Sequence, residues 1–317
     1  MQSFSTREIA EAGLMTAIMV ILALGASYIP LIGTLISFLF PVPLVILSLH
    51  HSLKTGIMAL IVSGIILILF TEPLYGIGFS ASFGSIGLVF GYMLKNGKGA
   101  NSTVLWGALA FLCGVVLVAF LSFIIMGINT FELYFKMYEE TFPTVIGIYK
   151  KLGLPTDQLD AMSKNWQEIM KFIKQALPSM LLVGGVIISA INYWIAHHIL
   201  KRIKIEIPPI SFSNLRLPPI TIFCFLLAFI LTAIGIKDPK SLIYNIGINL
   251  QVIFSVLFLL NGLLVVNFWF SKWGLTKAIK IVIFIFIIFQ PIFSQIVTWI
   301  GMLDTIFKFR KTEENTL

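Results

Sequence analysis

The chain has 317 residues, of which 58% are hydrophobic and only 11% are charged, and its mean hydropathy is +0.98. Soluble proteins carry about 25% charged residues, so this chain has too little polar surface to cover a soluble globule. The composition therefore excludes a soluble fold and indicates an integral membrane protein. The net charge of +8 comes mostly from residues at the ends of apolar runs, which is a topology signal and predicts no nucleic-acid partner.

The charged residues divide the chain into apolar segments that are long enough to cross a lipid bilayer. A membrane helix needs about 20 apolar residues, and the uncharged stretch from Glu11 to Lys54 is about twice as long. It must hold two spans, with Tyr28-Ile29-Pro30 as the break, because proline ends helices and tyrosine favours the interface. We expect an all-α bundle of eight or nine membrane segments, at about 7–28, 31–49, 53–70, 77–94, 103–127, 176–200, 218–236, 241–270 and 278–303.

The last of these segments is interrupted near its middle. Pro291 lies there between Gln290 and Gln295, and proline removes a helical hydrogen bond, so the segment is either kinked or a re-entrant pair of half-helices. The basic tail 308–311 would lie outside the cell if the segment crossed fully, which favours the re-entrant ending.

Lysine and arginine gather in alternate connections, which predicts the topology. The short loops Tyr28–Leu31 and Thr71–Gly76 carry neither residue, as expected of outer loops. With the N-terminus in the cytoplasm, the inner connections would hold Arg7, Lys54, Lys95, Lys98, Lys201, Arg202, Lys204, Arg216, Lys272, Lys277 and Lys280.

One outer connection is long and has its own pattern. Residues 129–175 contain six lysines and six acidic residues, and two apolar stripes at helical spacing predict two amphipathic helices. Pro143 is expected to kink the first helix, and Thr156 is the expected N-cap of the second. The pair either rests on lipid as an interfacial hairpin or forms a lid over the outer mouth of the bundle. The stripes are Phe131, Phe135, Tyr138, Phe142, Val145 and Tyr149, then Leu159, Met162, Trp166, Met170 and Ile173.

Two spans present small residues on one face, and in lipid such faces let helices approach closely. In the first span the face either packs within the bundle or docks a partner protein. In the fourth span either a neighbouring helix or a ligand presses against it. The residues are Ala10, Gly13 and Ala17 in the first span, and Ser80, Gly84, Gly87 and Gly91 in the fourth.

The stretch FPVPLVILSLHHSLKTG, residues 40–56, combines two prolines with two histidines. We expect Pro41 and Pro43 to bend a helix that descends toward the cytoplasm and to help shape a cavity. Adjacent histidines point to different faces of a helix, and His50 and His51 have no acidic or cysteine neighbour in the sequence. They are interpreted as marking where the helix meets water, so no metal site is expected.

Chemistry-bearing motifs are missing from the sequence. No span has a central acid or base, and there is no HExxH, GxSxG or Walker motif. Cys113 and Cys224 are isolated within apolar runs and read as small hydrophobic residues. We therefore expect no enzyme, no catalytic residue and no cofactor. The remaining polar side chains either hydrogen-bond between helices or bind a solute, and the candidates for ligand binding are Tyr75, Tyr244, Asn245 and Asn249.

Three stretches of the first 200 residues resemble the substrate-binding S subunits of energy-coupling factor (ECF) transporters. They are REIAEAGLMTAIMVILALG, the proline-containing FPVPLVILSLHHSLKTGIMALIVSG, and the glycine-rich fourth span ending in GLVFGYMLK. This resemblance implies a six-span core that binds a small molecule and docks through its first helix on a transmembrane coupling protein driven by ATPases. Only Ala10, Gly13 and Ala17 carry over, as the docking face. The spans after residue 217 and the insert at 129–175 depart from that pattern.

The whole chain resembles the YybS-like family of bacterial membrane proteins. INYWIAHHILKRI (191–203) matches the end of that family's sixth span, and GMLDTIFKFRK (301–311) matches its ending. The resemblance implies a multi-pass protein of the bacterial inner membrane but supplies no substrate. We expect an S-subunit-like core at 1–205 and further membrane helices at 206–317.

Two functions from different classes fit this sequence. The first is the binding or transport of a small uncharged or zwitterionic solute, energised by partner subunits. The second is a structural or assembly role in the cell envelope, in which the outer insert docks a partner and no solute moves. An intramembrane enzyme is disfavoured because the spans lack buried acid–base pairs.

Overall fold

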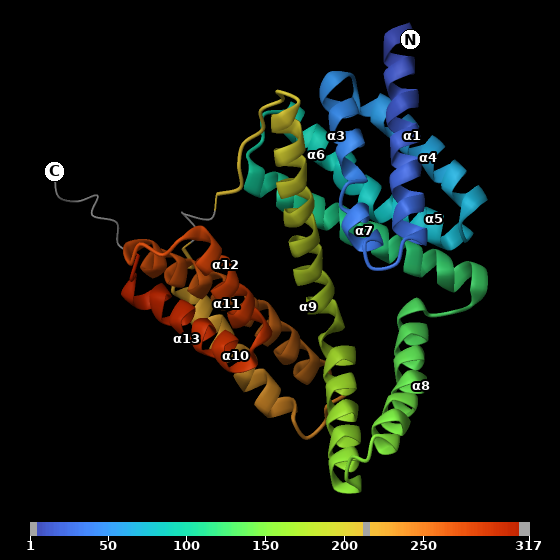
Figure 1. The fold of residues 1–317 in the computed structure, drawn as a ribbon. Helices are drawn as coiled ribbons and strands as arrows, with labels where there is room; N and C mark the ends of the chain where they lie inside the picture. The colour runs from blue at the N-terminus through green and yellow to red at the C-terminus, as the bar shows by residue number, and fades with distance from the viewer. Residues whose placement is uncertain (1–4, 212–215, 311–317) are drawn as a thin grey trace, which may run out of the picture. The chain divides into compact units, whose positions relative to one another are not determined.

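The computed structural model describes residues 5–211 and 216–310, which are 83% helical and contain no strand (Figure 1). The chain forms two compact units: residues 1–167 with 184–210, and residues 168–183 with 211–317. The first unit ends at residue 210, and residues 168–183, in the middle of the longest helix, group with the second unit.

The first unit begins with helices that correspond to spans 1 to 5. Ser5 caps the first helix by accepting a hydrogen bond from the Glu8 amide at 3.2 Å, and the helix ends at Tyr28, as predicted. The elements are α1 (Thr6–Tyr28), α2 (Gly33–Ser37), α3 (Pro41–His50), α4 (Leu53–Phe70), α5 (Pro73–Phe79), η1 (Ser80–Gly84), α6 (Ser85–Lys95) and α7 (Ala100–Met126).

The proline-containing second span differs from its prediction. It consists of the short helix α2 and the helix α3, and α3 begins at Pro41. Both prolines lie in the first turn of α3, where the backbone N–H groups have no partner within the helix. The span is therefore interrupted directly before Pro41, and the prolines begin its second helix instead of bending one continuous helix.

The fourth span runs as α5, η1 and α6, and η1 is a π-helical segment at Ser80–Gly84. A π-helical turn inserts an extra residue into the helical ladder. It falls at the small residues Ser80 and Gly84.

The outer insert is helical, but its second half is not a separate element. Helix α8 (Thr130–Lys151) begins at Asn129, whose side chain accepts from the Phe131 amide, and it continues through Pro143. Helix α9 (Thr156–Arg202) then runs for 47 residues through both the second amphipathic stripe and the sixth span. The cap position is Pro155, so the expected N-cap at Thr156 is wrong.

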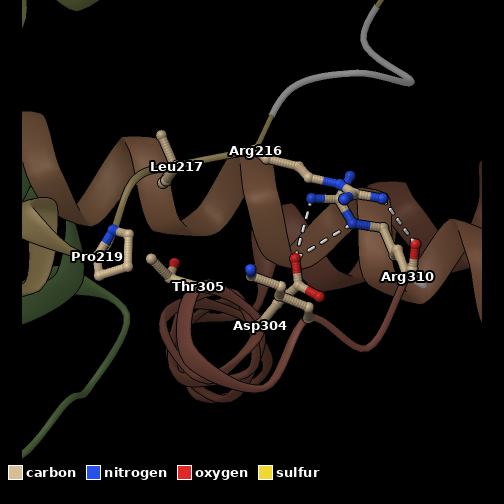
Figure 2. A pocket seen from close by; sticks show the side chains of 7 residues that line it. Arg216, Leu217, Pro219, Asp304, Thr305 and Arg310 are labelled. Atoms are coloured by element: carbon tan, nitrogen blue, oxygen red, sulfur yellow. Dashed lines mark hydrogen bonds and ion pairs between the residues drawn. The ribbon is translucent and has the colours of Figure 1, made fainter.

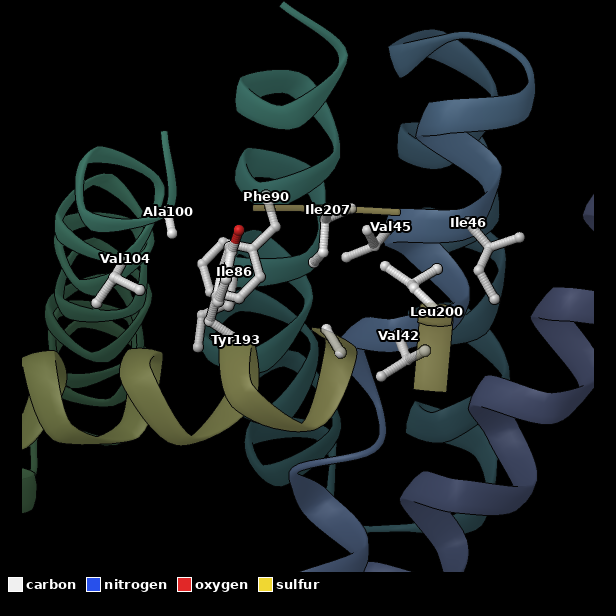
Figure 3. Packing of buried hydrophobic residues seen from close by; sticks show 11 residues of the cluster. Val42, Val45, Ile46, Ile86, Phe90, Ala100, Val104, Tyr193, Leu200 and Ile207 are labelled. Atoms are coloured by element: carbon white, nitrogen blue, oxygen red, sulfur yellow. The ribbon is translucent and has the colours of Figure 1, made fainter. Parts of the chain in front are cut away.

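The core of the first unit joins α3, α6, α7 and the end of α9 (Figure 3). Phe90 and Tyr193 are fully buried, with ring centroids 5.4 Å apart in an edge-to-face arrangement. The Tyr193 hydroxyl donates to the Pro208 carbonyl at 2.7 Å, which satisfies the polar end of this buried aromatic. Burial of these large side chains fixes the helices that support the candidate sites.

The second unit is built on close helix contacts at glycines. A Cβ at Gly262 or Gly301 would collide with the backbone of the facing helix, at Val297 and Phe258 respectively. The small residues thus let the helices approach closely. Besides residues 168–183, its elements are α10 (Ile220–Gly235), α11 (Leu242–Lys272), α12 (Lys277–Phe289) and α13 (Pro291–Phe307).

The described residues contain seven helices that are long and apolar enough to cross a membrane. An eighth candidate is the pair α12 and α13, which is bent by 103° at Gln290, so the predicted interruption at Pro291 is confirmed. Helix α10 is shorter, at 16 residues. The bent pair is a broken span or a re-entrant loop. The predicted basic tail lies partly outside the described residues, because Lys311 is not among them.

Candidate functional site

An apolar groove runs between α1 and α4 in the first unit, with a volume of about 520 Å³. We call it the α1–α4 groove. Gly13 and Ala17 line it, Ala10 is exposed on the same helix, and a Cβ added at Gly13 would meet no atom of the described residues within 4 Å. The remaining lining residues are Glu8, Ile9, Ala12, Thr16, Thr55, Met58, Ala59, Val62 and Ile66.

The small residues of the fourth span lie in a different environment. A Cβ at Gly87 would lie 2.6 Å from the Pro41 carbonyl oxygen and 2.8 Å from the Leu44 Cβ, and Gly91 lies against Ser48. Helix α3 therefore packs on this face. The Leu60 side chain fills the space beside Gly84, and the Ser80 side chain lies against Gly64.

His50 and His51 share one carboxylate from α1. Glu11 Oε1 lies 2.7 Å from His50 Nδ1, and its Oε2 lies 2.9 Å from His51 Nε2. The statement that these histidines have no acidic partner holds only for their sequence neighbours and is wrong for the fold. Glu11 and His50 both lie at the predicted inner ends of antiparallel spans, and this signal could have predicted the pairing but was not used. Among the described residues, no group of three or more His, Cys, Asp or Glu could hold a metal ion.

A polar cup lies where the C-terminal ends of α1 and α4 meet the start of α5. It has a volume of about 250 Å³ and is lined by Ser27, Tyr28, Thr71, Glu72 and Tyr75, and we call it the tyrosine cup. The Tyr28 hydroxyl donates to the Phe70 carbonyl at 2.5 Å, which ties α1 to the end of α4. Tyr75 stacks on Phe79, with ring centroids 5.8 Å apart. Of the four candidate ligand-binding residues, Tyr75 is the one that lines this cup.

Asn249 has a structural position in the second unit. Its Oδ1 accepts from the Ser179 amide at 2.9 Å, and its Nδ2 donates to the Gln175 carbonyl at 2.8 Å. In a regular helix these two groups would bond to each other. The amide is thus inserted into the backbone ladder of α9 beside Pro178, which has no N–H of its own.

Polar residues of α11 make further hydrogen bonds and contacts within the second unit. The Asn249 Nδ2 further donates to the Asn245 carbonyl at 2.8 Å, and Tyr244 lies against Gly235. The Gln251 amide donates to Thr232 Oγ1 at 2.8 Å. Ligand binding by Tyr244, Asn245 and Asn249 remains a prediction. Tyr244 and Asn249 contact neighbouring helices, and Asn245 donates to the Lys240 carbonyl just before its own helix at 3.5 Å.

A buried charged cluster in the second unit was not anticipated from the sequence. Arg310 Nη2 donates to Asp304 Oδ2 at 2.9 Å and to Asn261 Oδ1 at 2.5 Å. The side chains of Arg310 and Asp304 are only 10% and 6% exposed. Lys308 ends α13 in the left-handed conformation, with φ of 52°, which turns the chain back so that Arg310 reaches the helix. The spacing of six residues has no helical period, so no pattern predicted the pair.

The helices and these sites define a multi-pass α-helical membrane protein. A family described as "Predicted membrane protein (DUF2232)" matches residues 17–305, and the chain belongs to this family. It is 25% identical over 306 residues to the "Uncharacterized protein YybS" of Bacillus subtilis (strain 168), which covers 96% of this chain and 98% of that protein. No solved structure matches the chain. The expected YybS-like membrane protein is thus confirmed at the level of the family.

Proposed function

We propose that this chain is a solute-binding membrane subunit that resembles the S component of an ECF-type transporter and is energised by partner subunits. The first unit would supply both the solute-binding site and the surface that docks the partner. The tyrosine cup would hold the solute at the outer end of α1, and the α1–α4 groove would receive a transmembrane coupling protein. The protein would lie in the bacterial inner membrane with its N-terminus in the cytoplasm.

The observation that carries this proposal is the contrast between the two small-residue faces. The face of the fourth span is filled by α3 and by Leu60, whereas Gly13 in α1 has no neighbour within 4 Å of a Cβ. A glycine within a helix costs about 1 kcal/mol relative to alanine. An open face of small residues is therefore unexplained by packing within the first unit and suits the close approach of another helix.

The tyrosine cup indicates the class of solute. Glu72 is its only charged side chain, and it is accompanied by two tyrosines and two hydroxyl residues. A carboxylate and aromatic faces together favour an ammonium group. We therefore propose a zwitterionic solute with an amine, small enough for about 250 Å³.

We also propose that the chain itself is not an enzyme. Its sequence has no nucleotide-binding or hydrolytic motif, so ATP would be hydrolysed by partner ATPases. No catalytic residue, cofactor or metal is assigned to it.

Docking is tested by co-expressing the chain with an ECF coupling protein and its ATPases and by isolating the complex. Gly13→Leu and Ala17→Leu fill the groove and should weaken co-purification by about tenfold or more. Gly184→Leu is the matched control, because Gly184 also lies in an apolar helix with no atom within 4 Å of its Cβ position. Complexes that survive both groove variants would refute the docking face.

Solute binding is tested by native mass spectrometry of the purified chain. A retained small molecule that is lost in Glu72→Gln and in Tyr75→Phe, but kept in Glu132→Gln, would support the tyrosine cup. Glu132 is the control carboxylate, because it lies in the first turn of α8 and does not line the tyrosine cup. Retention that is unchanged in Glu72→Gln would exclude the cup as the binding site.

The second candidate is a structural or assembly role for the outer insert. Helix α8 has no buried residue, and Tyr134, Met137 and Tyr138 are each more than half exposed. Such aromatic exposure suits a lipid surface or a protein partner. Deletion of residues 130–151 separates the two functions. If the insert has the assembly role, the deletion should abolish envelope assembly and leave solute retention intact.

A further inference from the structure

We propose that the second unit carries a binding site for a phosphate group that also bears a hydrogen-bond donor, beside Asp304. The site is a small pocket with a volume of about 40 Å³, which we call the Asp304 pocket. Arg216, Pro219, Asp304, Thr305, Lys308 and Arg310 line it, and Figure 2 shows Arg216 and Arg310 reaching the same end of it over Asp304.

The floor of the pocket has an unsatisfied acceptor. Asp304 is 6% exposed, and its Oδ2 accepts from Arg310 and from the Asn261 amide at 3.2 Å. Its Oδ1 is buried and has no hydrogen-bond partner among the residues that the structure describes. A buried polar atom without a partner is costly, so a molecule bound in the pocket would be stabilised by donating a hydrogen bond to Oδ1. The pocket has room for such a donor group, since one water needs about 10–15 Å³.

The rim carries more positive charge than the floor neutralises. Arg310 and Asp304 form an ion pair at 2.9 Å. Arg216 and Lys308 are exposed cations that line the same pocket, and Arg216 Nη2 donates to the Arg310 carbonyl at 3.2 Å. The described residues that line the pocket therefore carry a net charge of two positive units. An anion would match this surplus, and guanidinium groups suit phosphate oxygens.

The combination of cationic rim and lone acceptor selects the chemistry of the ligand. A phosphate would lie against Arg216 and Lys308, and a hydroxyl or ammonium attached to it would donate to Asp304 Oδ1. Inorganic phosphate with a protonated oxygen meets this requirement, and so does the phosphoglycerol headgroup of an anionic lipid. The apolar helices α10 and α13 start and end at the pocket, so a lipid headgroup can reach it.

The experiment uses the full chain in neutral detergent, where no charged bilayer surface attracts lipid. Native mass spectrometry counts the phosphatidylglycerol retained after mixing with equal amounts of phosphatidylmethanol, which has the same charge but no hydroxyl. The wild type should retain phosphatidylglycerol in preference. The double variant Arg216→Gln/Lys308→Gln should retain at least about tenfold less, because each basic residue near a headgroup contributes about fivefold. Lys272→Gln/Lys277→Gln removes the same charge elsewhere in the second unit and should behave like the wild type.

A second arm distinguishes the source of the phosphate. Lipid-free chain is heated with and without inorganic phosphate, and an unfolding temperature raised in the wild type but not in Arg216→Gln/Lys308→Gln assigns the pocket to free phosphate. Equal retention of the two lipids would refute the role of Asp304 Oδ1. If the double variant retained phosphatidylglycerol and kept its response to phosphate, the proposed site would be overturned. Water alone would then satisfy Asp304 Oδ1.

Discussion

Gly87 provides the sharpest test of the packing in the first unit. Replacing it with alanine places a Cβ 2.6 Å from the Pro41 carbonyl oxygen and 2.8 Å from the Leu44 Cβ. Ordinary contacts of a Cβ start near 3.4 Å. Because the obstacle includes the backbone of α3, the clash cannot be relieved by rotating a side chain, and α3 must move away from α6.

The cost follows from two opposing effects. Overpacking a close interface costs about 1–3 kcal/mol, and the change from glycine to alanine within a helix returns about 1 kcal/mol. We expect a net loss of up to about 2 kcal/mol. For a unit of roughly 200 residues, this lowers the unfolding temperature by up to about 8 °C.

The measurement is thermal unfolding in detergent, followed by tryptophan fluorescence, since Trp106 and Trp194 lie in α7 and α9 of the first unit. Gly13→Ala is the matched control, because its Cβ meets nothing within 4 Å, and it should keep or slightly raise the unfolding temperature. If Gly87→Ala were as stable as Gly13→Ala, the contact between α3 and α6 would be refuted.

Three further substitutions test the polar contacts. Asp304→Asn leaves the 10% exposed Arg310 without its charge partner and should destabilise the second unit by about 3–5 kcal/mol. Adding Arg310→Gln to this variant should restore more than half of the lost unfolding temperature. Asn249→Leu should destabilise that unit by about 1 kcal/mol, and unchanged unfolding would show that its inserted amide contributes nothing. Glu11→Gln should lower the unfolding temperature of the first unit, because it removes the carboxylate oxygen that lies 2.7 Å from His50 Nδ1 or 2.9 Å from His51 Nε2; an unchanged unfolding temperature would contradict this pairing.

Local signals predicted much of the helical organisation. Tyr28-Ile29-Pro30 ended α1, and Pro291 interrupted the last segment, since proline acts on its own turn of the chain. Other prolines act differently. Pro41 starts α3, and Pro178 lies within the continuous helix α9, where the Asn249 side chain bonds the Gln175 carbonyl and the Ser179 amide.

The sites depended on contacts between distant residues, and these were harder to predict. The small-residue face of α1 was visible in the sequence, but nothing in it showed that Gly13 would stay open while Gly87 would be filled. Glu11 meets its histidines from about 40 residues away. Arg310 reaches Asp304 only because Lys308 adopts a left-handed conformation, which no periodic pattern encodes.

The affinity of the chain for a coupling complex tests the proposed docking face most directly. The chain is placed in lipid nanodiscs, and the dissociation constant for an ECF coupling protein with its ATPases is measured for the wild type, Gly13→Leu and Gly184→Leu. A leucine that overpacks the interface costs about 1–3 kcal/mol, so Gly13→Leu should weaken binding by about tenfold or more while Gly184→Leu binds like the wild type. Equal affinities for all three chains, or no binding by the wild type, would contradict the proposal that the α1–α4 groove receives a coupling protein.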